Sequence, residues 1–167
     1  MGRYRPPQPK SSPYITASGY AKLDAELKAL WKRRAYVVKI LAEAAAEGDR
    51  SENAEYIYRK KELREIDYRI RYLQRRLPEL KVVNNQPSNL QQVFFSAWVT
   101  LENDQGEEKT YRIVGPDEFE PKKGWISMDS PVAKALMKKL IDNEVKVETP
   151  NGIETFFISD VSYDKEE

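Results

Sequence analysis

The sequence of 167 residues contains no cysteine and no histidine. Disulfide bonds, thiol catalysis, Cys/His metal sites and histidine acid–base chemistry are therefore excluded. Any metal chemistry must use carboxylates, which favour hard cations such as Mg²⁺. The chain also lacks an apolar run long enough to span a membrane and a signal-peptide core near its N-terminus. We therefore expect a cytoplasmic protein with no membrane partner.

Charged residues, in contrast, are abundant. They make up 33% of the chain, and the mean hydropathy is −0.73. A compact globule of this size needs less polar surface, so the composition favours an elongated shape. The formal net charge of +1 hides a strongly basic segment at residues 59–76 and a strongly acidic one at residues 143–167. This asymmetry indicates different partners for the two halves.

Two runs with heptad-like spacing predict an antiparallel coiled-coil hairpin over residues 14–80. The first run begins after Thr16, and the second ends at Leu77-Pro78, with a polar turn at residues 48–51 between them. Layers that face each other in such a hairpin have residue numbers with a constant sum, and here the sum stays at 96 or 97. The facing pairs are Tyr20–Leu77, Leu23–Leu73, Leu27–Ile70, Leu30–Ile66, Arg34–Leu63, Val37–Arg59 and Leu41–Tyr56.

The alternative for this region is two helices of a globular bundle. A bundle needs apolar residues beyond the seam, and few are present, although Trp31, Val38 and Ile40 widen the apolar stripe of the first helix. The hairpin is therefore favoured. Because its seam is apolar at the base and polar near the turn, we expect the base to hold the structure.

The remaining chain predicts a second domain. Residues 1–13 are rich in Pro, Arg and Ser and are expected to form a disordered basic tail, and residues 81–90 a polar linker. Residues 91–167 alternate apolar positions with turn signals, which predicts an antiparallel β-sheet domain with one helix. The expected strands are 93–101, 109–114, 125–128, 144–149 and 155–161, and the helix is 132–140 with Ser130 as its cap. The fold class is α+β.

The turn between the helices carries two carboxylates, Asp49 and Glu52. Taken alone, Asp-x-x-Glu is most often a helix cap, with Asp49 as the cap and Glu52 at the third helical position. Nothing local, however, needs two carboxylates at the far end of a thin projection. Such a finger is suited to delivering negative charge into a site on another molecule.

The segment from Gly48 to Tyr56 resembles the tip motif of the Gre transcript cleavage factors of bacteria. The run 60–67 resembles the stretch after the tip in the GreB branch, and the runs 94–99, 111–115 and 126–131 resemble the C-terminal domain of the family. The resemblance extends over residues 14–163. Arg50 and the basic second helix favour the GreB branch over the GreA branch. The start of the chain and Glu62 depart from the family pattern without touching the tip.

The resemblance implies a factor that is monomeric when free, binds bacterial RNA polymerase and inserts its coiled coil into the secondary channel. It would stimulate the polymerase's own cleavage of backtracked RNA and would not itself be an enzyme. Asp49 and Glu52 would share a Mg²⁺ ion with the polymerase, with Ser51 and Asn53 in support. The resemblance also implies an FKBP-like fold for residues 91–167, which would dock on the polymerase.

Two further sets of residues are candidates for contacts. By resemblance, Asp129, Ser130 and Pro131 contact the rim of the polymerase channel, although locally they form an ordinary helix start. The basic residues of the second helix form either a solvated face, with i,i+4 pairs such as Glu65–Arg69, or a surface for the RNA 3′ end. The excess of positive charge favours RNA. The candidates are Arg59, Lys60, Lys61, Arg64, Arg71 and Arg75.

Three other functions compete with this hypothesis. A channel binder that regulates transcription without cleavage would share the fold, and only the two tip carboxylates argue against it. A peptidyl-prolyl isomerase would need an aromatic-lined pocket, whereas Trp98, Tyr111, Phe156 and Phe157 are expected in the core. A structural coiled-coil adaptor would need a longer seam and strong self-association.

Overall fold

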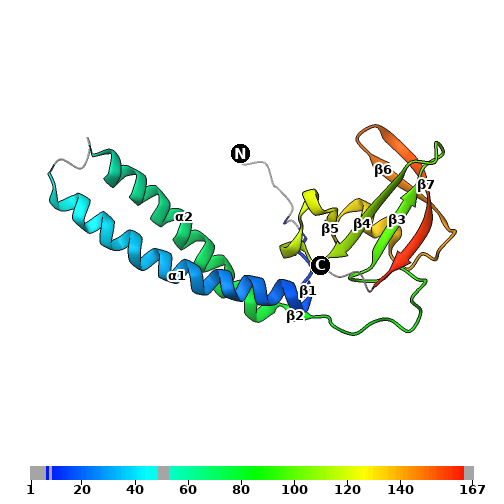
Figure 1. Ribbon diagram of the computed structural model, residues 1–167, viewed down its shortest axis with the longest axis horizontal. Helices are drawn as coiled ribbons and strands as arrows, with labels where there is room; N and C mark the ends of the chain where they lie inside the picture. The colour runs from blue at the N-terminus through cyan, green and yellow to red at the C-terminus, as the bar shows by residue number, and fades with distance from the viewer. Residues whose placement is uncertain (1–6, 8, 49–52, 164–167) are drawn as a thin grey trace. The chain divides into compact units, whose positions relative to one another are not determined.

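The computed structural model describes residues 7, 9–48 and 53–163 of the chain. It divides the protein into two compact units, one formed by Ser18–Leu80 and the other by Met1–Ala17 together with Lys81–Glu167 (Figure 1). The segment that precedes the hairpin thus belongs to the same unit as the C-terminal domain. Each unit is described separately below.

The first unit is the predicted helical hairpin. Helix α1 spans Ala17–Ala46 and helix α2 spans Ala54–Arg76, and the two run side by side in opposite directions (Figure 1). A 3₁₀ turn, η1 (Leu77–Glu79), ends α2 where proline was expected to end it. The core of the hairpin is a cluster of Val37, Ile66 and Ile70, against which the partly buried Leu27, Leu30 and Leu63 pack. All six residues belong to the predicted seam, so these seam positions are confirmed.

The second unit contains a sheet of five strands in the order β5-β4-β3-β7-β6 (Figure 1). The strands are β3 (Trp98–Glu102), β4 (Glu108–Val114), β5 (Trp125–Ser127), β6 (Glu144–Thr149) and β7 (Gly152–Ser162). All pairs are antiparallel except β4–β5, which is parallel. The sheet is therefore mostly, not wholly, antiparallel. The parallel pair arises because the 3₁₀ turns η2 (Pro116–Glu118) and η3 (Pro121–Lys123) carry the chain back before β5 begins.

The core of this unit lies between the sheet and one short helix, α3 (Pro131–Leu136). Alternating residues of the strands, such as Val99, Leu101 and Ile158, are completely or almost completely buried. Helix α3 adds Ala133 and Leu136, both with no exposed surface. Eleven buried residues form this cluster among those that the structure describes.

Three details of the expected sheet domain are wrong. The strand expected from residue 93 begins only at Trp98, because Ser96 adopts a positive φ of 69° and turns the chain. Helix α3 ends at Leu136 rather than at residue 140, because the N–H of Lys138 donates to the carbonyl of Val93 instead of continuing the helix. Phe157, expected in the core, is 43% exposed.

The segment before α1 is attached to the second unit by a small parallel sheet. Strand β1 (Tyr14–Ile15) pairs with β2 (Lys81–Val82), and Ile15 is completely buried. The chain passes so close to Gly115 that a Cβ there would lie 2.0 Å from the carbonyl oxygen of Tyr14. Only glycine fits such an approach. The end of the expected disordered tail therefore differs from prediction, since the backbone carbonyl of Pro13 accepts a hydrogen bond of 2.7 Å from Lys81.

Candidate functional site

Asn53 links the two helices at the end of the hairpin where the connecting turn lies. Its side-chain oxygen accepts a hydrogen bond of 3.1 Å from the N–H of Tyr56, which makes it the N-cap of α2. Its side-chain nitrogen donates to the carbonyl of Ala44, 3.0 Å away in the last turn of α1. One amide thus satisfies groups of both helix ends. The cap expected at Asp49 is instead Asn53, four residues later.

The predicted tip residues Asp49, Arg50, Ser51 and Glu52 lie outside the described residues. The sequence places them between Gly48, which has a positive φ of 127°, and Asn53. Within residues 7, 9–48 and 53–163, no three acidic side chains come together in a group that could hold a metal ion. The chemistry expected at the tip therefore remains a prediction about these four residues.

Ion pairs cross the hairpin at several points along its seam. Arg34, one of the two residues that interrupt the apolar seam, pairs with Asp67 of α2 at 2.7 Å. Arg69 pairs with Glu26 through two parallel hydrogen bonds of 2.8 and 3.1 Å. The alternative of a solvated basic face assumed that Asp67 and Arg69 form i,i+4 pairs along α2, whereas both residues pair across the two helices. The two helices are thus joined by charge as well as by packing.

Glu62 is the centre of a further charge cluster. It accepts hydrogen bonds from Arg33 at 2.7 Å and from Arg59 at 2.9 Å, and Arg59 also pairs with Glu55 at 2.9 Å. Burial of Glu62 opposes its ionisation, but the hydrogen bonds and charges of the two arginines outweigh that effect and lower its pKa. The pKa of Arg59 is raised mainly by its hydrogen bonds to Glu55 and Glu62. Arg59 is therefore bound into the hairpin.

The other basic candidates remain accessible on α2. Lys60, Lys61, Arg64, Arg71 and Arg75 are all exposed, and no carboxylate of the described residues forms an ion pair with any of them. Tyr68, which lies on the same face by helical spacing, is 72% exposed. We call Lys60, Arg64, Tyr68, Arg71 and Arg75 the basic face. It is a row of positive charge, and the neighbouring carboxylate of Asp67 is occupied by Arg34 of the other helix.

The predicted docking residues lie together at the start of α3. Ser130 caps the helix, with its hydroxyl accepting from the N–H of Ala133 at 3.2 Å, and Pro131 occupies the first helical position and is exposed. Asp129 is half-buried, and its carboxylate accepts two hydrogen bonds from Ser12, one from the backbone N–H at 2.9 Å and one from the hydroxyl. The expected local role of Ser130 is confirmed, while the contact of Asp129 with Ser12 was not foreseen.

Glu118 is a second polar residue that holds the N-terminal segment. Its buried carboxylate accepts from the N–H groups of Thr16 at 3.1 Å and Gly115 at 2.9 Å, and from the hydroxyl of Thr16. The local sequence indicates this capped turn, because a proline at the first position and a glutamate at the third are typical of one. The four residues are Gly115-Pro116-Asp117-Glu118. No local pattern marked Ser12, whose partner lies 117 residues away.

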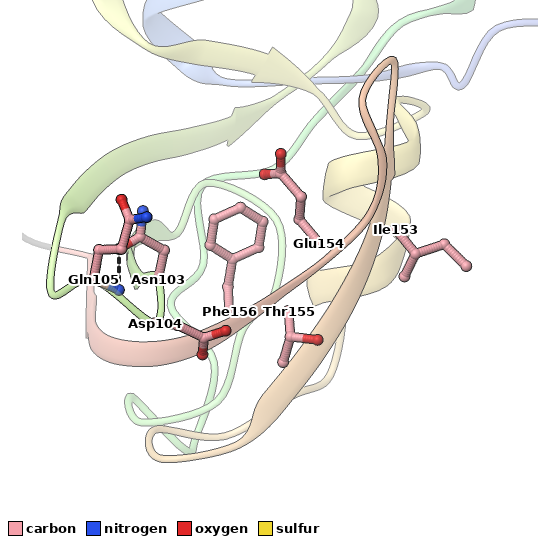
Figure 2. Close-up of a pocket in the computed structure, with 7 residues that line it drawn as sticks. All are labelled: Asn103, Asp104, Gln105, Ile153, Glu154, Thr155 and Phe156. Carbon is pink, nitrogen blue, oxygen red and sulfur yellow. Dashed lines mark hydrogen bonds between the residues drawn. The ribbon is translucent and has the colours of Figure 1, made fainter.

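A hollow of about 410 Å³ lies beside the β3–β4 turn and the start of β7 (Figure 2). Phe156 contributes an aromatic ring, and Asp104 and Glu154 contribute carboxylates. Asn103 is occupied within its own turn, where its side-chain oxygen accepts from the N–H of Gln105 at 3.0 Å. The lining includes neither Trp98 nor Tyr111, so it does not match the aromatic pocket that an isomerase would need. It also contains none of the predicted site residues.

Comparison with known families gives two matches that together account for most of the chain. The profile described as "Transcription elongation factor, N-terminal" (GreA/GreB) matches residues 13–82. The profile described as "Transcription elongation factor, GreA/GreB, C-term" matches residues 86–163. The boundary between the two matches falls in the linker after β2.

Curated relatives agree with these profiles over nearly the full length. Transcription elongation factor GreB of Pasteurella multocida is 58% identical over 155 residues, which is 92% of this chain and 98% of the relative. The GreB of Pseudomonas aeruginosa is 54% identical over 164 residues, covering 98% of both chains. That of Vibrio vulnificus (strain CMCP6) is 51% identical over 155 residues, covering 92% and 97%.

Solved structures with a detectable likeness are more distant. The GreA factor homolog 1 (Gfh1) protein of Thermus thermophilus has a TM-score of 0.42 and 24% identity, over 89% of this chain and 97% of its own. The GreA/GreB factor of Nitrosomonas europaea has a TM-score of 0.43 and 19% identity, over 91% and 100%. In the part of this chain that the structure describes, no helix is both long and apolar enough to cross a membrane.

Proposed function

This chain belongs to the GreA/GreB family of transcription elongation factors, and we propose that it binds bacterial RNA polymerase and stimulates cleavage of backtracked RNA. In this proposal the hairpin of α1 and α2 enters the secondary channel while the sheet domain docks outside it. The nuclease is the polymerase itself, and the factor supplies groups to its active site. The name GreB, shared by relatives that are 51–58% identical, supports a role in elongation.

The observation that carries the proposal is the construction of the hairpin end. Asn53 ties the start of α2 to the last turn of α1, and the sequence leaves only residues 49–52 between Gly48 and this clamp. Both tip carboxylates belong to that short connection. A closed helical pair delivers such a connection to a distant site with a small loss of conformational entropy.

Asp49 and Glu52 offer the hard oxygen ligands that Mg²⁺ prefers, and the donor set of the tip therefore fits this ion. Two carboxylates do not complete an octahedral shell, so we expect stable binding only when the polymerase contributes its own ligands. A second Mg²⁺ in that shared site would stabilise charge on the attacking and leaving oxygens during hydrolysis of RNA. Ser51 would assist as a hydroxyl ligand of bound water. Asn53 would act mainly by closing the hairpin.

The basic face gives the hairpin a second contact in the same complex. Lys60, Arg64 and Arg71 are exposed and carry no ion pair with a described carboxylate. Phosphates of the extruded RNA 3′ segment are the natural partners of such a row of charges. The exposed ring of Tyr68 lies in the same row, where it could stack on an unpaired base.

The test is a cleavage assay on RNA polymerase that is stalled in a backtracked state on a labelled transcript. The factor should shorten the transcript and release a 3′ fragment, and it should leave naked RNA intact because its own groups do not form a complete site. Binding to polymerase without faster shortening would contradict the cleavage role and would support the alternative of a regulator that occupies the channel. Cleavage of naked RNA would contradict the shared-site mechanism.

A further inference from the structure

We propose that Ser12 is a positioning residue for polymerase docking. The inference rests on the docking role proposed for Asp129. Ser12 would hold the Asp129 carboxylate in one orientation, so that the remaining lone pairs of the carboxylate face a cationic or N–H donor of the polymerase. The segment expected to be the end of a disordered tail would thus set the geometry of the contact.

The contacts fix the carboxylate at both oxygens. The N–H of Ser12 donates to one oxygen of Asp129 at 2.9 Å, and the Ser12 hydroxyl donates to the other. The backbone at Asp129 is held as well, because its own N–H donates to the hydroxyl of Ser127 at 3.1 Å. A surface aspartate with one hydrogen bond can still rotate about its side-chain bonds. One with both oxygens bound to the same residue is confined to a single rotamer.

Ser12 can perform this task because the chain immediately after it is anchored. Pro13 accepts a hydrogen bond from Lys81, Ile15 is completely buried, and Thr16 is bound to Glu118 through both its N–H and its hydroxyl. The close approach of the chain at Gly115 removes further freedom. The anchor is thus made of backbone and buried groups, and Ser12 is the first residue outside it.

The arrangement leaves Asp129 able to bind a partner. An ionised carboxylate offers about four lone-pair positions, and Ser12 uses two of them. Asp129 is only half-buried, and the neighbouring Pro131 is exposed. A carboxylate that is already oriented loses less conformational freedom on binding than a mobile one does. Ser12 therefore strengthens docking through Asp129 and does not compete with it.

The experiment measures the affinity of full-length variants for RNA polymerase by competition. Ser12→Ala should weaken binding about threefold to tenfold, the range expected when one side chain must be ordered on binding. Ser12→Thr keeps the hydroxyl and should retain most of the affinity. Ser11→Ala is the matched control, because Ser11 is an exposed serine of the same segment, and it should change nothing.

Two further readouts separate positioning from a general structural effect. In titrations of cleavage against factor concentration, Ser12→Ala should raise the half-saturating concentration and leave the maximal rate unchanged. In an Asp129→Ala background, Ser12→Ala should have no additional effect, because the group it orients is gone. A defect of equal size in both backgrounds would overturn the positioning role.

The remaining outcomes separate this inference from the proposed docking itself. Unchanged or tighter binding by Ser12→Ala, while Asp129→Ala binds weakly, would refute the positioning role alone. It would leave docking through Asp129 in place. Unchanged binding by Asp129→Ala would refute the docking role of this loop, and the positioning role of Ser12 would fail with it.

Discussion

The hairpin and the sheet domain of this protein are stabilised in different ways. The sheet domain has a cluster of eleven buried residues contributed by strands, α3 and the segment before β3, many with no exposed surface. The hairpin has a smaller cluster of three buried residues, with others such as Leu23 and Leu73 buried along the seam. Ion pairs such as Arg34–Asp67 and Arg69–Glu26 extend the contact between its helices. Each exposed ion pair contributes little to stability. We therefore expect the hairpin to have a smaller free energy of unfolding than the sheet domain.

The difference follows from what each region can bury. A sheet covered by a helix encloses side chains on several sides, whereas two helices present only a narrow seam to each other. Under the proposed function the hairpin would enter a narrow channel, and a third layer would make it too thick to do so. The partly polar seam is therefore a consequence of having only two helices. Ion pairs across the helices add to the contact between them.

The largest expected effect tests this comparison with one substitution made twice. Ile158 of the sheet domain and Ile66 of the hairpin have 0% and 6% exposed surface. We expect Ile158→Ala to lower the free energy of unfolding by about 4 kcal/mol and Ile66→Ala by about 2 kcal/mol, because an enclosed core cannot collapse around the cavity whereas a two-helix seam can. Regional hydrogen exchange on the full chain would measure each effect in its own unit.

Exchange is preferable to a single melting curve because two units need not unfold together. Ile158→Val, which removes one methylene group, is the control and should cost about 1 kcal/mol. Equal destabilisation of the two units by the alanine substitutions would show that the seam is as rigid as the sheet core. The contrast drawn above would then be wrong.

The second prediction concerns the tip, where function and stability should separate. Asp49→Asn or Glu52→Gln should lower stimulated RNA cleavage at least about 100-fold, since even an indirect partner of a metal ligand is worth 10–100-fold. Neither change should alter polymerase affinity or the melting of the protein by more than a small amount. The measurement is the single-turnover cleavage rate on a backtracked complex at saturating factor.

Glu47→Gln provides the matched control for the tip. Glu47 is an exposed carboxylate two residues before Asp49, and its N–H already closes the last turn of α1 on the carbonyl of Ala44. The substitution removes the same charge from nearly the same place. If Glu47→Gln reduced cleavage as much as Asp49→Asn, the effect would come from general negative charge at the hairpin end and not from ligands.

The third prediction concerns the basic face and should be smaller. Replacing Lys60, Arg64 and Arg71 by glutamine should slow cleavage of long backtracked transcripts by roughly threefold to tenfold, and short ones less, because a longer 3′ segment offers more phosphates. The difference between wild type and variant should shrink as salt rises, since salt screens the contacts that the variant lacks. Cleavage rates against backtrack length at two salt concentrations would show both trends.

A matched triple variant on the other helix tests whether position or net charge matters. Lys22, Lys32 and Lys39 are exposed on α1, and their replacement by glutamine removes the same charge. This variant should cleave at the wild-type rate for every transcript length. Equal defects in the two triple variants would mean that only the overall charge of the hairpin attracts the complex.

The sequence predicted the hairpin better than the sheet because helical spacing is a local signal. The heptad-like spacing placed Leu27, Leu30, Ile66 and Ile70 on the seam, and the structure packs them in one cluster. The predicted start of the first strand, at residue 93, was wrong. The apolar alternation continues across a turn at Ser96, and no sequence pattern predicts the positive φ of that residue. The parallel pairing of β4 and β5 likewise depends on how the intervening turns fold.

Contacts between distant parts of the chain were the main omission. Ser12 and Asp129 are separated by 117 positions, and nothing in the local sequence of either residue indicates the other. The alternative of a solvated basic face paired Arg69 with Glu65, whereas Arg69 pairs with Glu26 of the other helix, because an i,i+4 rule considers a single helix. The predicted cap at Asp49 failed because Asn53 satisfies both helix ends, which requires the second helix to be in place.

The smallest expected effect is a pH dependence confined to the hairpin. Arg33 and Arg59 lower the pKa of Glu62 from its usual value of 4.5, in spite of its partial burial. A carboxylate with a lowered pKa in the folded state stabilises that state above pH 4.5, and the contribution is lost as pH falls through the lowered value. Glu62→Gln should therefore lower the melting temperature of the helical signal by about 1–2 °C at pH 7, and wild type and variant should converge once the pH is well below the lowered pKa. Glu65→Gln is the control, because Glu65 is exposed on the same helix and forms no ion pair with a described residue, so its substitution should give the same small change at every pH. A difference between wild type and Glu62→Gln that persisted well below the lowered pKa would show that Glu62 acts through packing and not through its charge.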